Sequence, residues 1–314
     1  MNRSEPHVSV QRLDVVLDYE AATAGLPVVE ESMYPTSRGS FSASCTTAVT
    51  GEVAIHRASS HAPSVGVTVL DPAHVAFLVA RSGDGPLHIN GHECSEASVW
   101  LPGANHEFYI RGGAREMLGV SVRRERLLQA LAALHGVDLE DASIASNRLN
   151  FAPAASALLF HRLSRMLESP NAHDVRTWDE TVVMMLAEVH CAGGIMSTES
   201  DRTRSDAWIV RRAEEYVSAA EPGHVSLADL CLATGVGRTA LYRAFHSLCG
   251  EAPFTYFRRR RLVRARSLIL RSTYERAAIK RCALEAGFRE LGRFSREYRH
   301  LFGELPSETL SLRT

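Results

Sequence analysis

Residues 226–307 repeat one plan twice, and this repeat constrains the fold more than any other feature of the chain. Each unit has an amphipathic helix, a short turn containing glycine, and a second helix rich in arginine. The first turn falls at 235–237 and the second at 286–288. Two helices joined in this way form the helix-turn-helix pattern, whose second helix enters the major groove of DNA. The repeat predicts an all-α DNA-binding domain with two helix-turn-helix motifs.

Charge is distributed unevenly along the chain. Residues 205–314 hold 19 Lys and Arg against 12 Asp and Glu, a charge of +7, whereas residues 1–204 hold 16 against 24, a charge of −8. The two values sum to the whole-chain charge of −1. A basic half attached to an acidic half indicates that double-stranded DNA binds at one end only.

Composition narrows the class further. The 314 residues suffice for two domains, and no apolar run is long enough to span a bilayer. The first residues lack the apolar core of a secretory signal, so we expect a cytoplasmic protein without membrane contact. None of the six cysteines forms a CxxC pair, so we expect reduced thiols and no metal or other cofactor.

The first half of the chain reads as β-structure followed by helices. Residues 33–40 predict a loop, and the weak apolar segment 13–17 fits either a helix or a strand. Short apolar stretches then recur between turn clusters, which is typical of a barrel or sandwich. They lie around 46–55, 66–70, 75–80, 86–90, 97–101, 107–110 and 117–122. The turn at 101–106 after an apolar strand resembles the jelly-roll barrel of cupins, so we predict a cupin-like β-barrel over 40–122.

Helical periodicity begins at residue 123. It predicts helices over 123–134, 153–167 and 175–190, with Gly136 ending the first. Their apolar stripes need a partner, either the barrel or a second copy of the chain, and the pattern leaves both uses open. The predicted organisation is an α+β two-domain chain. It comprises a sensing and dimerisation domain at 1–191 (helices 123–191), a linker at 192–205, and a DNA-binding domain at 206–314 that opens with a helix at 206–219.

The first repeat unit offers mixed chemistry for reading bases. Ser226 and Asp229 predict a capping box at the start of its first helix. In the second helix, Thr239, Tyr242 and Arg243 lie opposite an apolar face. Arginine can pair with both acceptors of guanine, and a threonine methyl can pack on the thymine methyl.

The second unit carries a stripe of arginines. Arg289, Arg293 and Arg296 share one helix face opposite Phe294, Tyr298 and Phe302. Like charges at this spacing repel, which favours a polyanion in front of them over a merely solvated face. The run of four arginines at 258–261 points all round its helix. One or two of these should reach phosphate, and others should pair with acids such as Glu285 or Glu290.

The segment 226–307 resembles the DNA-binding domain of the AraC/XylS family of bacterial transcription regulators. The motifs are LxRxF from Leu241, GxxP from Gly250, RLxxAR from Arg261, GF from Gly287, FSRxY from Phe294, and FGxxPS ending at Ser307. The resemblance implies base contacts from Thr239, Tyr242, Arg243, Arg293 and Arg296. It further implies phosphate contacts from Ser295, and we add Arg238 and Arg261 as phosphate candidates. The chain departs from the family pattern in having Gly237 where the first recognition helix usually begins with Ser, and Gly292 offers no side chain for base reading.

The resemblance also implies function and partners. It predicts a dimer that binds promoter direct repeats, contacts RNA polymerase and responds to a small-molecule effector, acting as an activator and not as an enzyme. His56, Phe77, Trp100 and Phe108 are candidates for an effector pocket in the barrel, although such residues also serve as plain core.

Two alternatives remain. A cupin-type metalloenzyme fused to a DNA-binding domain requires clustered ligands, and His88, His92 and His106 lack the HxH spacing that places two ligands on one strand face. A non-specific architectural DNA binder conflicts with the acidic first half of the chain.

Overall fold

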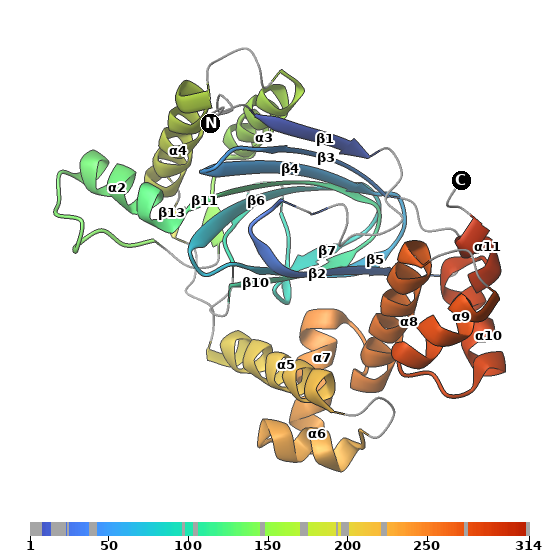
Figure 1. The fold of residues 1–314 in the computed structure, drawn as a ribbon. Helices are drawn as coiled ribbons and strands as arrows, with labels where there is room; N and C mark the ends of the chain where they lie inside the picture. Colours follow the sequence, from blue (N-terminus) through green and yellow to red (C-terminus); the bar gives the residue numbers. More distant parts are fainter. Residues whose placement is uncertain are drawn as a thin grey trace, which may run out of the picture.

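The protein is described from a computed structural model. It covers residues 8–13, 23, 25–37, 43–95, 98–102, 106–144, 148–169, 175–192, 194–195, 201–220, 225–272 and 276–311. All described strands precede residue 196, and the part that follows is helical (Figure 1). The predicted combination of a sheet-rich first domain and a helical second domain is confirmed.

The described strands form two antiparallel sheets. The first has the order β1-β3-β4-β11-β6-β9-β12-β13 and the second the order β2-β5-β10-β7-β8. The first contains β1 (Ser9–Leu13), β3 (Ala43–Val49), β4 (Val53–Ser60), β6 (His74–Ser82), β9 (Ser98–Trp100), β11 (Arg115–Arg123), β12 (Arg148–Asn150) and β13 (Gly194–Ile195). The second contains β2 (Val28–Pro35), β5 (Ser64–Leu70), β7 (Leu87–Ile89), β8 (His92–Glu93) and β10 (Glu107–Gly112).

The predicted cupin-like barrel does not close into a continuous ring of described strands. No pair of described strands joins the two sheets by a hydrogen-bonded ladder, so the sheets face each other across an apolar interior. The chain passes from β5 to β6 through a short turn in which His74 N–H donates to the Asp71 carbonyl at 2.9 Å. Such turns carry the chain between sheets instead of extending one ladder around a closed circle.

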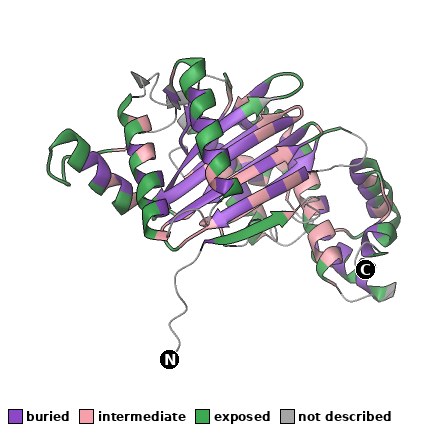
Figure 2. Cartoon of the chain, turned by 90° about the horizontal axis from the view of Figure 1, so that it is seen from above, coloured by how far each residue is buried: buried purple, intermediate pink, exposed green. Residues whose placement is uncertain are grey.

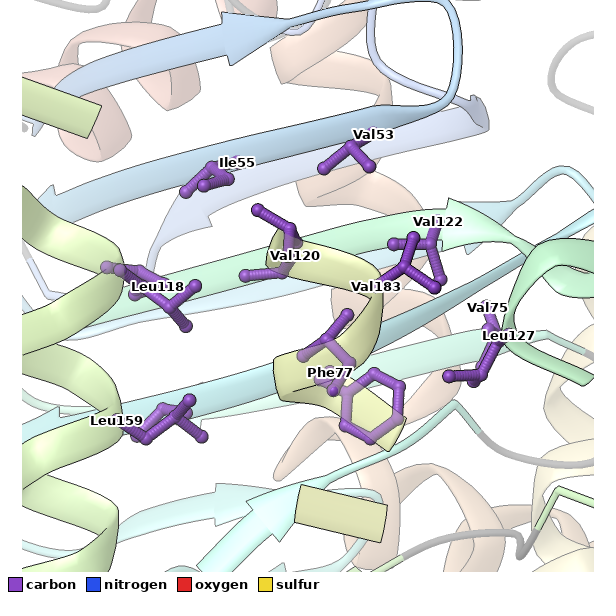
Figure 3. Packing of buried hydrophobic residues seen from close by; sticks show 14 of the residues in the cluster. Val53, Ile55, Val75, Phe77, Leu118, Val120, Val122, Leu127, Leu159 and Val183 are labelled. Carbon is purple, nitrogen blue, oxygen red and sulfur yellow. The ribbon is translucent and has the colours of Figure 1, made fainter. Parts of the chain in front are cut away.

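Side-chain alternation divides each central strand between two faces. In β6, Val75, Phe77 and Val79 join the cluster beneath the helices, whereas Ala76 and Leu78 point into the space between the sheets. Figure 3 shows Val75 and Phe77 on the helix side, together with residues of β4, β11 and helices α2–α4. This is the period of two that strands impose on their side chains.

Three helices cover the outer face of the first sheet. They are α2 (Arg124–His135), α3 (Pro153–Glu168) and α4 (Val175–Ala192), as the sequence predicts. Gly136 ends α2 with a φ of 63°, a left-handed conformation that glycine adopts easily. Burial follows the predicted stripes, with polar helix faces exposed to solvent (Figure 2). Covering the sheet is therefore one use of these apolar stripes.

The second domain consists of seven described helices. They are α5 (Asp201–Ala219), α6 (Leu227–Thr234), α7 (Arg238–Cys249), α8 (Pro253–Arg271), α9 (Arg276–Glu285), α10 (Leu291–Phe302) and α11 (Pro306–Ser311). Glycines in the left-handed conformation end α6, α7 and α10, at Gly235, Gly250 and Gly303. The helix pairs α6–α7 and α9–α10 coincide with the two repeat units. Among the described residues, no helix combines the length and apolar character that crossing a bilayer requires.

Three local predictions differ from the structure. Helix α5 begins at Asp201, inside the predicted linker 192–205, and β13 also falls within it. Strand β2 continues through Pro35, so the predicted loop begins later than residue 33. The stretch 46–55 is a hairpin, because Thr50 turns the chain by hydrogen bonds with Val53. Residues 14–17, 38–40, 103–105 and 196–200 lie outside the described residues.

The helical domain docks on the outer face of the second sheet. Val65, Val67 and Tyr109 share one buried cluster with Val210 of α5 and Leu248 of α7. Helices α5, α7 and α8 lie beside this sheet in Figure 1. The two domains thus share a hydrophobic core, and this core holds α5 and α7 against the second sheet.

Candidate nucleic-acid interface

Helix α6 starts with the predicted capping box. The Asp229 N–H donates to Ser226 Oγ at 3.2 Å, and the Ser226 N–H donates to Asp229 Oδ2 at 2.8 Å. These bonds satisfy two of the N–H groups that a helix start leaves without partners. The hydrogen bonds from Ser226 lower the pKa of Asp229, which keeps this cap ionised. The prediction of a capped helix before the first turn is confirmed.

Helix α7 presents two different faces. Leu241, Phe245 and Leu248 are fully buried in the core shared with the first domain. At the N-terminal end of α7, Arg238 and Thr239 are exposed. The Arg238 guanidinium lies 5.4 Å from the centre of the Tyr242 ring. Because residues near the start of a recognition helix reach base edges, this orientation suits DNA reading.

Arg243 is held by an acid that the sequence reasoning missed. Its Nη2 and Nε lie 3.1 and 3.4 Å from Oδ1 of Asp206, on α5. Asp206 is only 2% exposed, whereas the Arg243 side chain is 44% exposed. One edge of the guanidinium is therefore engaged by the protein and the rest faces solvent. Nothing in the sequence pairs these positions, which lie on different helices.

The arginines of the connecting helix α8 have partners other than the predicted Glu285 and Glu290. Arg258 Nη1 lies 3.7 Å from Glu297, and Arg259 Nη1 lies 2.7 Å from Glu251. Arg260 pairs with Glu30 of the first domain and with Glu214 of α5. The prediction failed because α8 packs against β2, α5 and α10, and the sequence does not reveal which acids these contacts bring to its arginines.

The surroundings of Arg261 differ from those expected of an arginine that contacts phosphate. It is half-buried, and its guanidinium lies over the Phe288 ring at 5.7 Å. Burial lowers the pKa of Arg261, and Arg258 beside it lowers the pKa further. Arg261 thus packs α8 against the turn before α10, a role that competes with the predicted phosphate contact.

Helix α10 carries the second set of predicted contact residues. Phe294, Tyr298 and Phe302 form its buried face, as predicted. Arg293 and Arg296 are exposed on the other side, and Arg293 Nε donates to Glu297 at 2.8 Å. This hydrogen bond and the charge of Glu297 raise the pKa of Arg293.

The remaining positions on α10 are less prominent. Ser295 is half-buried, and the space in front of Gly292 is open. Glu297, one helical turn after Arg293, was overlooked in the sequence although its spacing is the signal for such an ion pair.

A groove between α8 and α10 gathers positive charge. It is lined by Arg258, Arg259, Arg293, Arg296 and His300, with Glu297 as its acid. Thr36 of the first domain lies at its rim, where the Thr36 carbonyl accepts from Arg259 at 3.4 Å. Clustered guanidinium groups are suited to phosphate oxygens.

The predicted effector residues separate into two groups. His56 and Phe108 line a cavity of about 90 Å³ between the sheets. Phe77 lies on the opposite face of the first sheet, beneath the helices, because odd positions of β6 point outward. Trp100 is buried beside Phe108 but is not among the residues that line the cavity. Its indole N–H donates to Cys94 Sγ at 3.3 Å. Phe77 and Trp100 are therefore core residues.

The metal-site alternative lacks its ligand set in the part of the chain that the structure describes. No group of three or more His, Cys, Asp or Glu side chains there is arranged to hold a metal ion. The cupin-type metalloenzyme requires such a cluster of ligands, and the described residues do not form one.

Comparison with known proteins agrees with this geometry. The helix-turn-helix domain family matches residues 230–311. The XylDLEGF operon transcriptional activator 2 of Pseudomonas putida is 36% identical over 101 residues, covering 32% of this chain and 64% of that protein. The probable thc operon regulatory protein of Rhodococcus erythropolis is 28% identical over 204 residues, covering 62% of this chain and 60% of that protein. This chain thus spans less than two thirds of both relatives.

Among solved structures, a probable AraC family transcriptional regulator from Rhodopseudomonas palustris is 35% identical. The match covers 33% of this chain and 96% of that chain, with a TM-score of 0.30. Together with the exposed start of α7, the family match and the curated relatives indicate a DNA-binding helix-turn-helix domain at residues 230–311. Residues 230–311 belong to the helix-turn-helix domain family, and over this part the chain is similar to the named transcriptional activator of Pseudomonas putida.

Proposed function

We propose that the chain binds two direct repeats of a promoter as a homodimer, activates transcription through RNA polymerase and responds to a small-molecule effector. The observation that carries the proposal is the exposure of Arg238 and Thr239 at the start of α7, whose other face is core. The matching relative from Pseudomonas putida is named a transcriptional activator, which favours activation. A regulator of this kind works where the chromosome is, in the cytoplasm.

The finer architecture belongs to the same proposal. We assign the second helix pair, α9–α10, as a second helix-turn-helix head, supported by the exposed Arg293 and Arg296. Residues 1–191 are proposed as a cupin-like sensing and dimerisation domain and 206–314 as the DNA-binding domain. The groove between α3 and α4, lined by Leu158 and Met185, suits dimer contact. Leu158 is 51% exposed, so it leaves apolar surface available for such a contact.

Selection of bound duplexes from a random DNA pool tests the proposal. The full chain should enrich two similar half-sites whose centres lie about 34 Å apart, one turn of B-DNA. Arg296→Ala should cost about 1–3 kcal/mol on the enriched site and little on random DNA. Arg165→Ala, on the exposed face of α3, serves as the matched control. A pool without a preferred sequence, or equal losses on both DNAs, contradicts the proposal.

Phosphate contacts are tested by the salt dependence of binding. Arg238→Ala should flatten the slope of log affinity against log salt by about one unit, because one phosphate contact is lost. Since Arg261 stacks on Phe288, Arg261→Ala should leave the slope unchanged and lower the unfolding free energy instead. If the slope flattens for Arg261→Ala but not for Arg238→Ala, then Arg261 contacts phosphate and Arg238 does not. Titrations at several salt concentrations and urea denaturation supply both values.

A further inference from the structure

The cavity between the two sheets has mostly apolar walls. Leu78, Phe108, Ile110 and Met117 are among its lining residues. Four polar side chains also reach it: Glu31, His56, Thr68 and Ser121. Among the described residues, no lysine or arginine lines the cavity. An anionic ligand would find no counter-charge there, and burying an unpaired charge is strongly unfavourable.

The two titratable groups of the cavity are uncharged near neutral pH. Burial lowers the pKa of His56 to about 4, and Thr47 Oγ1 lies 2.8 Å from its Nδ1. Burial likewise raises the pKa of Glu31 to about 8. Cys45 beside Glu31 is also kept as a thiol, because burial raises its pKa to about 11. The cavity therefore offers neutral hydrogen-bonding groups on an apolar surface.

Strand β2 connects this cavity to the helical domain. Glu31 lines the cavity, while Glu30 on the opposite face pairs with Arg260 of α8 and with Arg211 of α5 at 3.2 Å. Among the described strands β2 pairs only with β5, and its register shifts between Val28 and Glu30. An edge strand with an irregular register yields more readily than a central strand.

The same wall borders a second space. The groove between β2 and α8 is lined by Leu26, Val28 and Glu31, which also line the cavity, and by Arg260 and Arg264 of α8. The segment 26–31 therefore lies between the cavity and this groove. A molecule in the cavity touches the wall against which α8 is held.

We propose that the cavity binds a small uncharged molecule, apolar with one hydrogen-bonding group, and that its occupancy reaches the DNA-binding helices through the Glu30–Arg260 pair on β2. This inference rests on the proposed effector response and specifies both its ligand and its route. The size of the space sets the scale of the ligand. A dry cavity of about 150 Å³ accommodates benzene, so about 90 Å³ suits a smaller aliphatic molecule.

The ligand class is tested with a series that differs only in charge. We choose 1-butanol, butyrate and butylammonium, titrated by calorimetry into the full chain near neutral pH. The alcohol should bind, and the two ions should bind at least about tenfold more weakly because each must leave water unpaired. Butyrate or butylammonium binding as tightly as the alcohol overturns the proposal. A dissociation constant of the alcohol above about 10 mM also overturns the proposal.

Two variants locate the binding. Gly119→Leu places a side chain in the cavity, where the glycine has only distant neighbours at 4.0 Å, and should abolish alcohol binding. Glu31→Gln keeps the shape of the wall and should leave alcohol affinity within about threefold, since no charge is involved. If Gly119→Leu does not fold, Glu31→Gln alone tests whether the contact between the alcohol and the cavity is uncharged. Loss of alcohol binding in Glu31→Gln would contradict an uncharged contact.

The route is tested by Glu30→Gln. This variant should bind the alcohol normally, whereas the change in DNA affinity that the alcohol causes in the wild type, about fivefold or more, should vanish. Glu180→Gln on the exposed face of α4 is the matched control and should retain the change. An undiminished alcohol effect in Glu30→Gln refutes the route. Calorimetry contains no DNA, so a chain that fails to select DNA but binds the alcohol contradicts only the proposed regulator.

Discussion

At the scale of residues, Asp206 orients Arg243, which we predict to read bases. The buried carboxylate engages one edge of the guanidinium and leaves the other toward solvent. We expect Arg243→Ala to cost about 1–3 kcal/mol on the selected DNA site and little on random DNA. Asp206→Asn should lose part of that specificity, because the arginine remains but is no longer held. Fluorescence titrations with both DNAs measure this.

Arg212 on α5 supplies the control for that experiment. It pairs with Glu215 on the surface, at 3.0 Å, away from α7. Arg212→Ala should leave the ratio of specific to random affinity unchanged. If Asp206→Asn also leaves that ratio unchanged, Asp206 does not position Arg243.

The cavity carboxyl makes stability depend on pH in a defined direction. The pKa of Glu31 rises to about 8 on folding, so the folded state holds its proton more tightly than the unfolded chain. This contribution is present below the ordinary pKa of about 4.5 and is lost as pH rises toward 8. His56 acts oppositely, because its lowered pKa removes stability as pH falls from 6.5 to about 4.

Glu31→Gln isolates the carboxyl, since His56 is common to both proteins. The unfolding free energy of the variant relative to wild type should grow with pH between about 5 and 8, by up to about 1 kcal/mol per pH unit. Urea denaturation at several pH values measures the difference. A difference that stays constant or shrinks with pH shows that Glu31 is already ionised in the folded protein.

The sequence could predict the residues whose environment is set by their neighbours along the chain, but not those whose environment is set by distant segments. The exposed Thr239 and the buried Phe245 follow from helical periodicity alone. Glu31 carried no such signal, because two adjacent acids, Glu30 and Glu31, in a stretch without clean alternation look like surface residues. Phe77 was misplaced for a related reason: β6 is apolar on both faces, so its sequence does not reveal which face meets the cavity.

At the scale of elements, the start of helix α7 offers a test of capping. Gly237 is its N-cap, with extended backbone, no side-chain cap bond and open space around it. Gly237→Ser should supply the missing hydrogen bond and raise the unfolding free energy by a few tenths to about 1 kcal/mol. Thermal or urea denaturation of the full chain gives the value.

Gly235 provides the counterpart within the same turn. Its surroundings are equally open, but its φ of 65° is left-handed. Gly235→Ser should therefore destabilise the chain by about 1 kcal/mol. Equal effects of the two substitutions would mean that backbone conformation does not decide them.

Elements with strong periodicity were predicted well, whereas their ends and weak strands were not. Helices α2, α3 and α4 carry apolar stripes, and their predicted ranges agree with the structure to within a few residues. The first turns of α5 were assigned to a linker because 201–205 is polar throughout. Strand β2 was missed because its edge position and mixed residues leave no clean alternation.

At the scale of the whole molecule, domain docking was beyond prediction although one signal existed. Strand β5 is buried on both faces, with Val65 and Val67 outward and Leu70 inward. Such a strand demands a second covering layer. The partners of that layer, such as Leu248, lie far away in sequence, so periodicity could not identify them.

The shared core predicts that both domains unfold together. Tyr34 of β2 donates to Glu251 Oε1 at 2.6 Å, and burial together with this bond raises the pKa of Tyr34. Calorimetry of the full chain should show a single transition, because neither domain can keep this surface buried alone. Tyr34→Phe should lower the unfolding free energy by about 1–2 kcal/mol, since Glu251 then loses its hydrogen bond from Tyr34. Tyr216→Phe, at an exposed position on α5, should change little. Two resolved transitions in the wild type, or equal effects of both substitutions, exclude a docked interface that stabilises the chain.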